Sequence, residues 1–194
     1  IIGGAVIAGY TILGGFLAAS MTDLVQSIIM SIALVVIVFF GIEMAGGWDA
    51  VKAAASFDGY ISLSTTTDII SKKVVPYDAL TIASTLAWGL GYFGMPHILL
   101  RFMAIEDENK LKTSRRVASV WVVISMGVAV LIGVVGYSLM QMGILPTYAD
   151  ASAAETIIVD IASVLSKYGF VPAITGGIIL AGILASTMST ADSQ

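Results

Sequence analysis

Five long apolar segments dominate the chain, separated by polar stretches of unequal length. Helices of about 19 to 27 residues are long enough to cross the ~30 Å hydrocarbon core of a bilayer. The pattern therefore predicts an all-α membrane protein with five transmembrane helices. The segments cover about residues 1–19, 24–42, 79–103, 117–142 and 169–194.

The polar stretches predict how these helices are oriented. Residues 104–116 form a short loop that is rich in basic residues, whereas the longer loops 43–77 and 143–168 contain few. Basic residues concentrate on the cytoplasmic side of membrane proteins. Loop 104–116 is therefore expected to be cytoplasmic, and the two longer loops are expected to be extracellular. The basic residues of the short loop are Lys110, Lys112, Arg115 and Arg116.

Two shorter features refine this pattern. A turn over residues 20–23 is expected between the first two segments, with Asp23 at the start of the second helix, where Asp is a favoured N-cap. The run 156–165 has apolar residues at helical spacing and is amphipathic. It is expected to form a helix that lies against the protein or the membrane interface without spanning it.

The composition agrees with a membrane protein. The 194 residues are 58% hydrophobic and 11% charged, whereas soluble domains are roughly 25% charged. The net charge of −4 gives no basic footprint for nucleic acid. Cysteine is absent, which excludes disulfides and thiolate metal sites. With one histidine and no catalytic motif, the chain is not expected to be an enzyme.

Both ends of the sequence lie in apolar surroundings. Ile1 opens inside the first apolar segment, and Gln194 closes inside or just beyond the fifth. The chain is interpreted as an internal piece of a longer protein, one partial transmembrane domain. A multi-pass protein of a bacterial or archaeal plasma membrane is the default expectation.

The third segment contains an interruption and an aromatic face. Three glycines and Pro96 fall within residues 89–96, and Gly costs ~1 and Pro ~3 kcal/mol inside a helix. Interrupted helices of this kind often build binding sites in transporters. Trp88, Tyr92 and Pro96 recur every four residues and share a face that suits an organic solute. The alternative is that the glycines only permit close packing and the aromatics only fill space.

The end of the fifth segment is rich in side-chain oxygens. Ser186, Ser189, Thr190 and Ser193 share one helical face, and Asp192 lies beside them. Such oxygens are hard ligands that suit a hard cation, and sodium is the favoured ion. The alternative is that these hydroxyls bond to carbonyls of their own helix.

At these residues the sequence resembles the solute:sodium symporter family, and within it the sodium/proline symporters. The stretch from Trp88 to Met103 is the most specific part of the resemblance. The resemblance implies two inverted repeats of five helices, the fold of the leucine-transporter superfamily, to which this chain would contribute core helices four to eight. The matching positions are residues 14–18, 22–23, 26, 88–103, 115–116 and 188–194.

The resemblance also implies roles for the oxygen-bearing residues. Ser189 and Thr190 would bind the sodium ion common to the fold through their side chains, and Ser186 through its backbone carbonyl. Some family members hold a second sodium ion, whose pattern falls on Asp23, Ser189, Asp192 and Ser193. Sodium would be the only metal and would act as the cofactor of transport.

For the solute, the resemblance points to proline. Trp88, Tyr92 and Pro96 match positions tied to proline binding in the family. Met95 stands where family members carry Gln, which leaves the identity of the solute open. The first core helix, which completes both the sodium and solute sites, lies outside this chain.

The sequence therefore predicts sodium-coupled symport of a small organic solute, with proline favoured, by alternating access across a lipid bilayer. Two alternatives remain open at this stage. The solute could be another amino acid, pantothenate or a sugar. The chain could also belong to the symporter-like sensor domain of a membrane histidine kinase.

Overall fold

The computed structural model describes residues 2–57, 59–60, 62–67 and 73–193. This part of the chain is mostly helical, and it divides into two compact units. The first unit comprises Ile1–Ala54 and Val122–Gln194, and the second comprises Ala55–Trp121. The long helix α5 (Lys110–Gln141) contributes its first turns to the second unit and the rest to the first.

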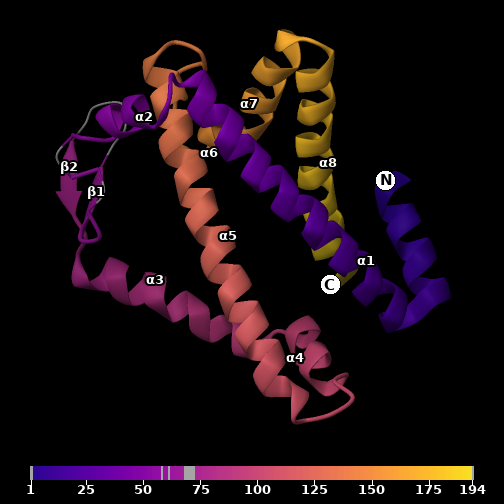
Figure 1. Cartoon of the computed structure of the whole chain (residues 1–194). Coiled ribbons are helices and arrows are strands. Elements are labelled where there is room, and N and C mark those ends of the chain that lie inside the picture. The colour runs from indigo at the N-terminus through magenta and orange to yellow at the C-terminus, as the bar shows by residue number, and fades with distance from the viewer. Residues whose placement is uncertain (1, 58, 61, 68–72, 194) are drawn as a thin grey trace. The chain divides into compact units, whose positions relative to one another are not determined.

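The first unit is built around two long helices that run side by side, α1 (Ile2–Met44) and α8 (Phe170–Ser193) (Figure 1). Helix α7 (Ile157–Leu165) packs against both of them and forms over the amphipathic run of the sequence. The remaining elements of this unit are α2 (Trp48–Ala54), α6 (Ala151–Ala154) and the 3-10 turn η2 (Ser166–Tyr168).

The core of this unit lies where the apolar faces of these helices meet. Ala33 and Ile37 of α1, Ile161 of α7 and Ile179 of α8 are almost fully buried in one cluster. Gly182 of α8 allows the close approach of α1, because a Cβ atom at this position would lie 2.7 Å from the Cβ of Ala33. A small residue therefore sets the spacing of the two helices.

Helix α1 is interrupted at Gly15, not over residues 20–23 as the sequence predicted. Gly15 has φ 60° and ψ −157°, a conformation that essentially only glycine adopts. The chain reverses direction at this point, and the first helical segment folds back sharply (Figure 1). Residues 20–23 are helical, and within this helix the Thr22 hydroxyl donates to the carbonyls of Ala18 and Ala19.

The second unit begins with a short antiparallel pair of strands, β1 (Thr65–Thr67) and β2 (Val74–Pro76), in which Thr66 lies opposite Val75. These β-branched residues favour extended backbone. Helix α3 (Ala79–Gly91) follows, and Asp78 caps it by accepting a 2.8 Å hydrogen bond from the backbone N–H of Thr81. The bonds from Thr81 hold the pKa of Asp78 below its ordinary value.

The third apolar segment is interrupted, as its glycines and proline predicted. Helix α3 ends at Gly91, the 3-10 turn η1 (Tyr92–Gly94) follows, and α4 (Pro96–Met103) begins after a break. Met95 is extended, with φ −79° and ψ 120°, because the ring of Pro96 disfavours helical geometry in the preceding residue. Pro96 then occupies the first turn of α4, where its missing N–H costs little.

Three helices of the described residues are long and apolar enough to cross a membrane. They are Thr11–Met44, Lys110–Gln141 and Phe170–Ala191, and α3 is a shorter apolar helix. Many of their large apolar side chains are exposed, among them Leu13 of α1 and Val123 of α5. Such surfaces are stable against lipid or against further protein, but they are costly in water.

Candidate ion and solute sites

A hydrogen bond between two polar side chains joins α1 and α8. The hydroxyl of Ser189 donates to Oδ1 of Asp23 over 2.7 Å, and Asp23 is only 9% exposed. A buried carboxylate is stable only where charges or donors compensate for its lost hydration. The alternative role of Asp23 as an N-cap is wrong, because α1 continues through residues 20–23 and the carboxylate faces α8.

The same end of α8 brings together the oxygens expected to bind sodium. The Thr190 hydroxyl donates to the Ser186 backbone carbonyl over 3.0 Å. This is the bond within one helix that the alternative interpretation described. It also places the hydroxyl oxygen and the carbonyl oxygen next to each other, so one cation can contact both. The contact between Thr190 and Ser186 therefore fits both a sodium site and a simple bond within the helix. The contact between Asp23 and Ser189 joins two helices and says more about a candidate ion site.

A cavity of about 230 Å³ lies along the seam of α1, α7 and α8, one turn from Ser189. Most of its lining is apolar, and Ser186 and Thr187 are the two hydroxyl-bearing residues among the lining residues. The Thr187 hydroxyl bonds to the Ile183 carbonyl over 3.1 Å. The cavity therefore gives Ser186 an open space one helical turn before Ser189.

Gln26 belongs to the stretch that resembles the family, but the sequence predicted no role for it. Its Oε1 atom is buried and has no hydrogen-bond partner among the residues that the structure describes. Gln26 lies one turn after Asp23 on α1, so the two residues share a side of the helix. An amide oxygen is a hard ligand. The signal that was present in the sequence is an amide inside an otherwise apolar segment.

The side chains of two predicted ligands lie outside the described part of the structure. The backbone of α8 extends through Asp192 and Ser193, but their side chains are not among those that the structure describes. Of the set predicted for a second sodium ion, the structure brings together Asp23 and Ser189.

The residues predicted to bind the solute lie at the interruption in the second unit. Trp88 belongs to α3, Tyr92 begins η1 and Pro96 begins α4. The ring centroids of Trp88 and Tyr92 are 6.2 Å apart, with an angle of 55° between the ring planes. Trp88 is 73% exposed and Tyr92 46%, so both rings are open to contact. Met95 follows in the extended break, and its backbone N–H donates to the Tyr92 carbonyl.

Comparison with known proteins identifies the family of this chain. The profile of the sodium:solute symporter family matches residues 1–194, the whole chain. The chain belongs to the sodium:solute symporter family. This confirms the resemblance that the sequence motifs indicated. The family consists of multi-pass membrane transporters and not of enzymes, and sodium is a transported substrate in it. The expectation that sodium serves as a cofactor is corrected accordingly.

Similar curated proteins include several proline transporters. The chain is 40% identical over 194 residues to the high-affinity proline transporter PutP of Bacillus subtilis, covering 97% of this chain and 36% of that protein. It is 38% identical over 191 residues to the osmoregulated proline transporter OpuE of Bacillus subtilis, covering 98% and 35%. It is 36% identical over 185 residues to sodium/proline symporter 2 of Staphylococcus saprophyticus, covering 95% and 33%.

The chain thus spans about a third of the length of these relatives. No solved structure matches it.

Proposed function

We propose that the full-length protein couples the entry of sodium to the uptake of a small organic solute, namely proline, by alternating access. The observation that carries this proposal is the contact between Asp23 and Ser189, a buried carboxylate and a hydroxyl joined between two apolar helices. Membership of the symporter family and the proline-transporter names of the relatives support the choice of ion and solute.

Sodium binds, in this proposal, at the end of α8. The hydroxyl oxygens of Ser189 and Thr190 and the backbone carbonyl of Ser186 are its ligands. The Ser189 hydroxyl donates a hydrogen bond to Asp23. The lone pairs of its oxygen therefore remain available to coordinate a cation. A site made mostly of neutral oxygens holds sodium modestly, as a transporter that must release its ion requires.

A second sodium ion would use the charged part of this region. Asp23 and Ser189 supply oxygens from α1 and α8, and Asp192 and Ser193 complete the set. The buried carboxylate favours this assignment, because a cation compensates a buried negative charge more fully than neutral donors do. Gln26, with its buried and unpartnered carbonyl oxygen, is the nearest further oxygen along the same side of α1.

Proline binds, in this proposal, at the broken third segment. The ring of Trp88 offers an apolar surface to the pyrrolidine ring, and the phenol of Tyr92 donates a hydrogen bond to the carboxylate. Pro96 holds the break open, because it fixes the extended conformation of Met95. Met95 lies in the same break, three residues after Tyr92, and is therefore the residue proposed to tune which solute fits.

The arrangement in the membrane completes the proposal. The five apolar segments each cross the bilayer as core helices four to eight of a leucine-transporter-like fold, and the first two of them are separated at Gly15. Loop 104–116 is cytoplasmic, and loops 43–77 and 143–168 are extracellular. The mostly helical structure with three long apolar helices and the family profile support this assignment.

Coupling follows from the energetics of the two sites. Ion and solute together must favour a conformation that neither favours alone. Sodium bound between α1 and α8 would hold these helices in the outward-open arrangement and complete the solute site. Loosening of the ion site on the cytoplasmic side would then release both.

Uptake of labelled proline by the full-length protein in proteoliposomes tests the proposed solute. Uptake that is competed by excess unlabelled proline, but not by pantothenate or glucose, is the expected result. Uptake of one of the other solutes instead of proline would contradict the assignment of proline as the solute and would implicate Met95 in solute selection. No uptake of any of them would contradict transport and favour the sensor domain of a histidine kinase.

A further inference from the structure

A basic concavity lies in the second unit, between α4 and the first turns of α5. Its volume is about 500 Å³. Its apolar lining includes Ile98, Ile105 and Leu111, which are half-buried, whereas the basic residues on it are exposed. The concavity therefore combines an apolar floor with a cationic rim. The basic rim residues are Arg101, Lys112 and Arg115.

Basic side chains outnumber the carboxylates around this rim. Residues 101–116 carry five basic and three acidic side chains. Glu106 pairs with Lys110 over 3.1 Å, outside the lining of the concavity. Asp107 accepts hydrogen bonds from the backbone N–H and the side-chain amide of Asn109. Within the described part of the chain, neither Lys112 nor Arg115 forms an ion pair.

The depth of this rim is fixed by the sequence of α5. Arg115 and Arg116 directly precede Val117, where the long apolar stretch of a membrane-crossing helix begins. In a membrane the rim therefore lies at the level of the lipid phosphates. Ser114 and Ser119 also line the concavity and add hydroxyl donors for phosphate oxygens.

We propose that this concavity binds the headgroup of an anionic phospholipid. Arg101, Lys112 and Arg115 contact the phosphate, and the acyl chains continue over the apolar floor formed by Ile98 and Ile105. Basic pockets between membrane helices on the cytoplasmic side are suited to anionic headgroups. The guanidinium groups can also bind phosphate through two parallel hydrogen bonds. The inference rests on the proposed orientation of loop 104–116, but not on the identity of the solute.

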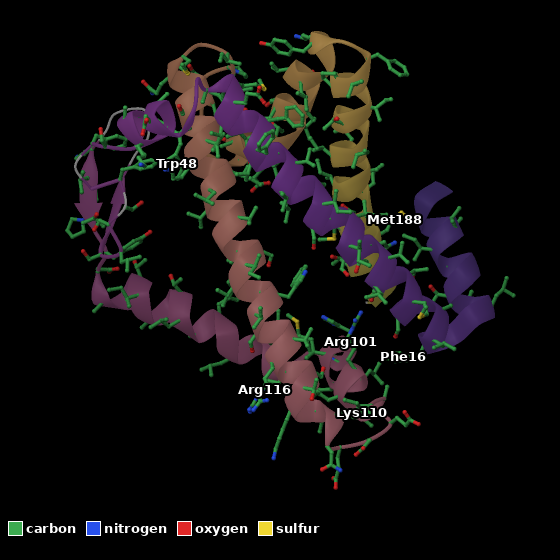
Figure 2. The ribbon with its side chains drawn as sticks, viewed as in Figure 1. Phe16, Trp48, Arg101, Lys110, Arg116 and Met188 are labelled. Carbon is green, nitrogen blue, oxygen red and sulfur yellow. The ribbon has the colours of Figure 1, made fainter. Side chains whose placement is uncertain are left out.

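The chain offers a matched control in the adjacent arginine. Arg116 is next to Arg115 in the sequence but does not line the concavity. In Figure 2 the labelled side chains of Arg101 and Arg116 extend to opposite sides of α5. Replacing either Arg115 or Arg116 removes the same charge from the same loop, so only binding in the concavity distinguishes the two variants.

Native mass spectrometry of the detergent-purified full-length protein, titrated with cardiolipin or with phosphatidylcholine, tests the proposal. Cardiolipin should bind in preference to phosphatidylcholine. Each of the variants Lys112→Gln and Arg115→Gln should weaken cardiolipin binding about fivefold, given about 1 kcal/mol for each basic residue at a membrane surface. Arg116→Gln should change it less than twofold, and Lys112→Arg should retain wild-type binding.

Three results would overturn the proposal. One is equal weakening by Arg115→Gln and Arg116→Gln, which would indicate a general charge effect. Another is equal binding of cardiolipin and phosphatidylcholine. The third is displacement of cardiolipin by an excess of inorganic phosphate at matched ionic strength, which would assign the concavity to a free anion. Unchanged thermal unfolding of each variant excludes misfolding as the cause, and proline uptake reports separately on the proposed function.

Discussion

Asp23 and Ser189 lie 166 positions apart in sequence, yet their side chains meet at 2.7 Å between α1 and α8. The same two helices also pack closely at Gly182, where an added Cβ would lie 2.7 Å from the Cβ of Ala33. A polar contact and a close-packed apolar seam therefore hold the same pair of helices together. Changes at the ion site and changes in the spacing of these helices are expected to be linked.

Removing either partner of the Asp23–Ser189 bond should destabilise the protein, and removing both should cost less than the sum. Ser189→Ala leaves a buried carboxylate without one donor, which costs about 1–3 kcal/mol. A double-mutant cycle with Asp23→Ala should give a coupling free energy of about 1–3 kcal/mol. The measurement is chemical unfolding of the full-length protein in detergent.

Thr187→Ala is the control for this cycle. It removes a hydroxyl of the same helix that bonds to the Ile183 carbonyl instead of to α1. Its effect should add to that of Asp23→Ala. A cycle in which the pair Asp23 and Ser189 is also additive would mean that their hydrogen bond does not contribute to stability.

Gly182→Ala should force α1 and α8 apart. The added Cβ would lie 2.7 Å from the Cβ of Ala33, an atom that cannot move without its helix. Overpacking of this kind costs about 1–3 kcal/mol. The control is Gly177→Ala, because a Cβ at Gly177 meets nothing within 4 Å. The higher helix propensity of Ala should raise the free energy of unfolding of this variant by up to about 1 kcal/mol. Equal unfolding free energies of the two variants would contradict the close packing.

The loop before α7 should titrate unusually at alkaline pH. The hydroxyl of Tyr148 donates to Oδ2 of Asp160 over 2.9 Å. Burial raises the pKa of Tyr148 above its ordinary value of 10.0, and the bond to the Asp160 carboxylate and its charge add to this rise. Because the pKa is raised on folding, the bond stabilises the fold fully below pH 10.0 and is lost as the pH rises further.

Ultraviolet titration of tyrosinate, with Tyr148→Phe subtracted from wild type, isolates this group. Asp160→Asn should return the pKa of Tyr148 toward its ordinary value. Thr156→Val should leave it raised, although Thr156 also donates to Oδ2 of Asp160, because the bond from Tyr148 remains. An unshifted Tyr148 in the wild-type protein would show that the hydrogen bond is absent in the folded protein.

Tyr92→Phe should weaken proline uptake without changing the requirement for sodium. Loss of a hydrogen bond from the phenol to the proline carboxylate should raise the KM for proline about tenfold. Tyr168→Phe removes another exposed phenol, from the other unit, and serves as the control. Met95→Gln should change the ratio of KM values for proline and competing amino acids. If neither Tyr92→Phe nor Met95→Gln alters the KM for proline, the proposed solute site at the break between α3 and α4 is contradicted.

Hydropathy and turn chemistry were enough to anticipate much of the architecture. The glycines and Pro96 predicted the break between α3 and α4, because their backbone preferences are local. The break in α1 was placed at residues 20–23 instead of at Gly15, since hydropathy does not reveal a positive φ. The short strands around Thr66 and Val75 were also missed, because three-residue strands leave little periodic pattern.

The candidate ion site could be predicted only in part from local sequence patterns. The oxygens of α8 were visible as one helical face. The partner of Asp23 was not, because a contact across 166 positions depends on how α1 and α8 pack. From the residues alone, an N-cap was the simpler interpretation of Asp23, and only the family resemblance linked it to Ser189. Gln26 was missed for the same reason, since its burial depends on packing.

The sodium concentration that gives half-maximal proline uptake tests the central claim most directly. It should be measured in proteoliposomes for the wild-type protein and for Ser189→Ala, Thr190→Ala and Thr187→Ala. The account predicts that this sodium concentration rises about tenfold in Ser189→Ala and Thr190→Ala, because each variant loses an oxygen ligand of sodium. It predicts no change for Thr187→Ala. Wild-type sodium dependence in both Ser189→Ala and Thr190→Ala would contradict the assignment of the ion site to this end of α8.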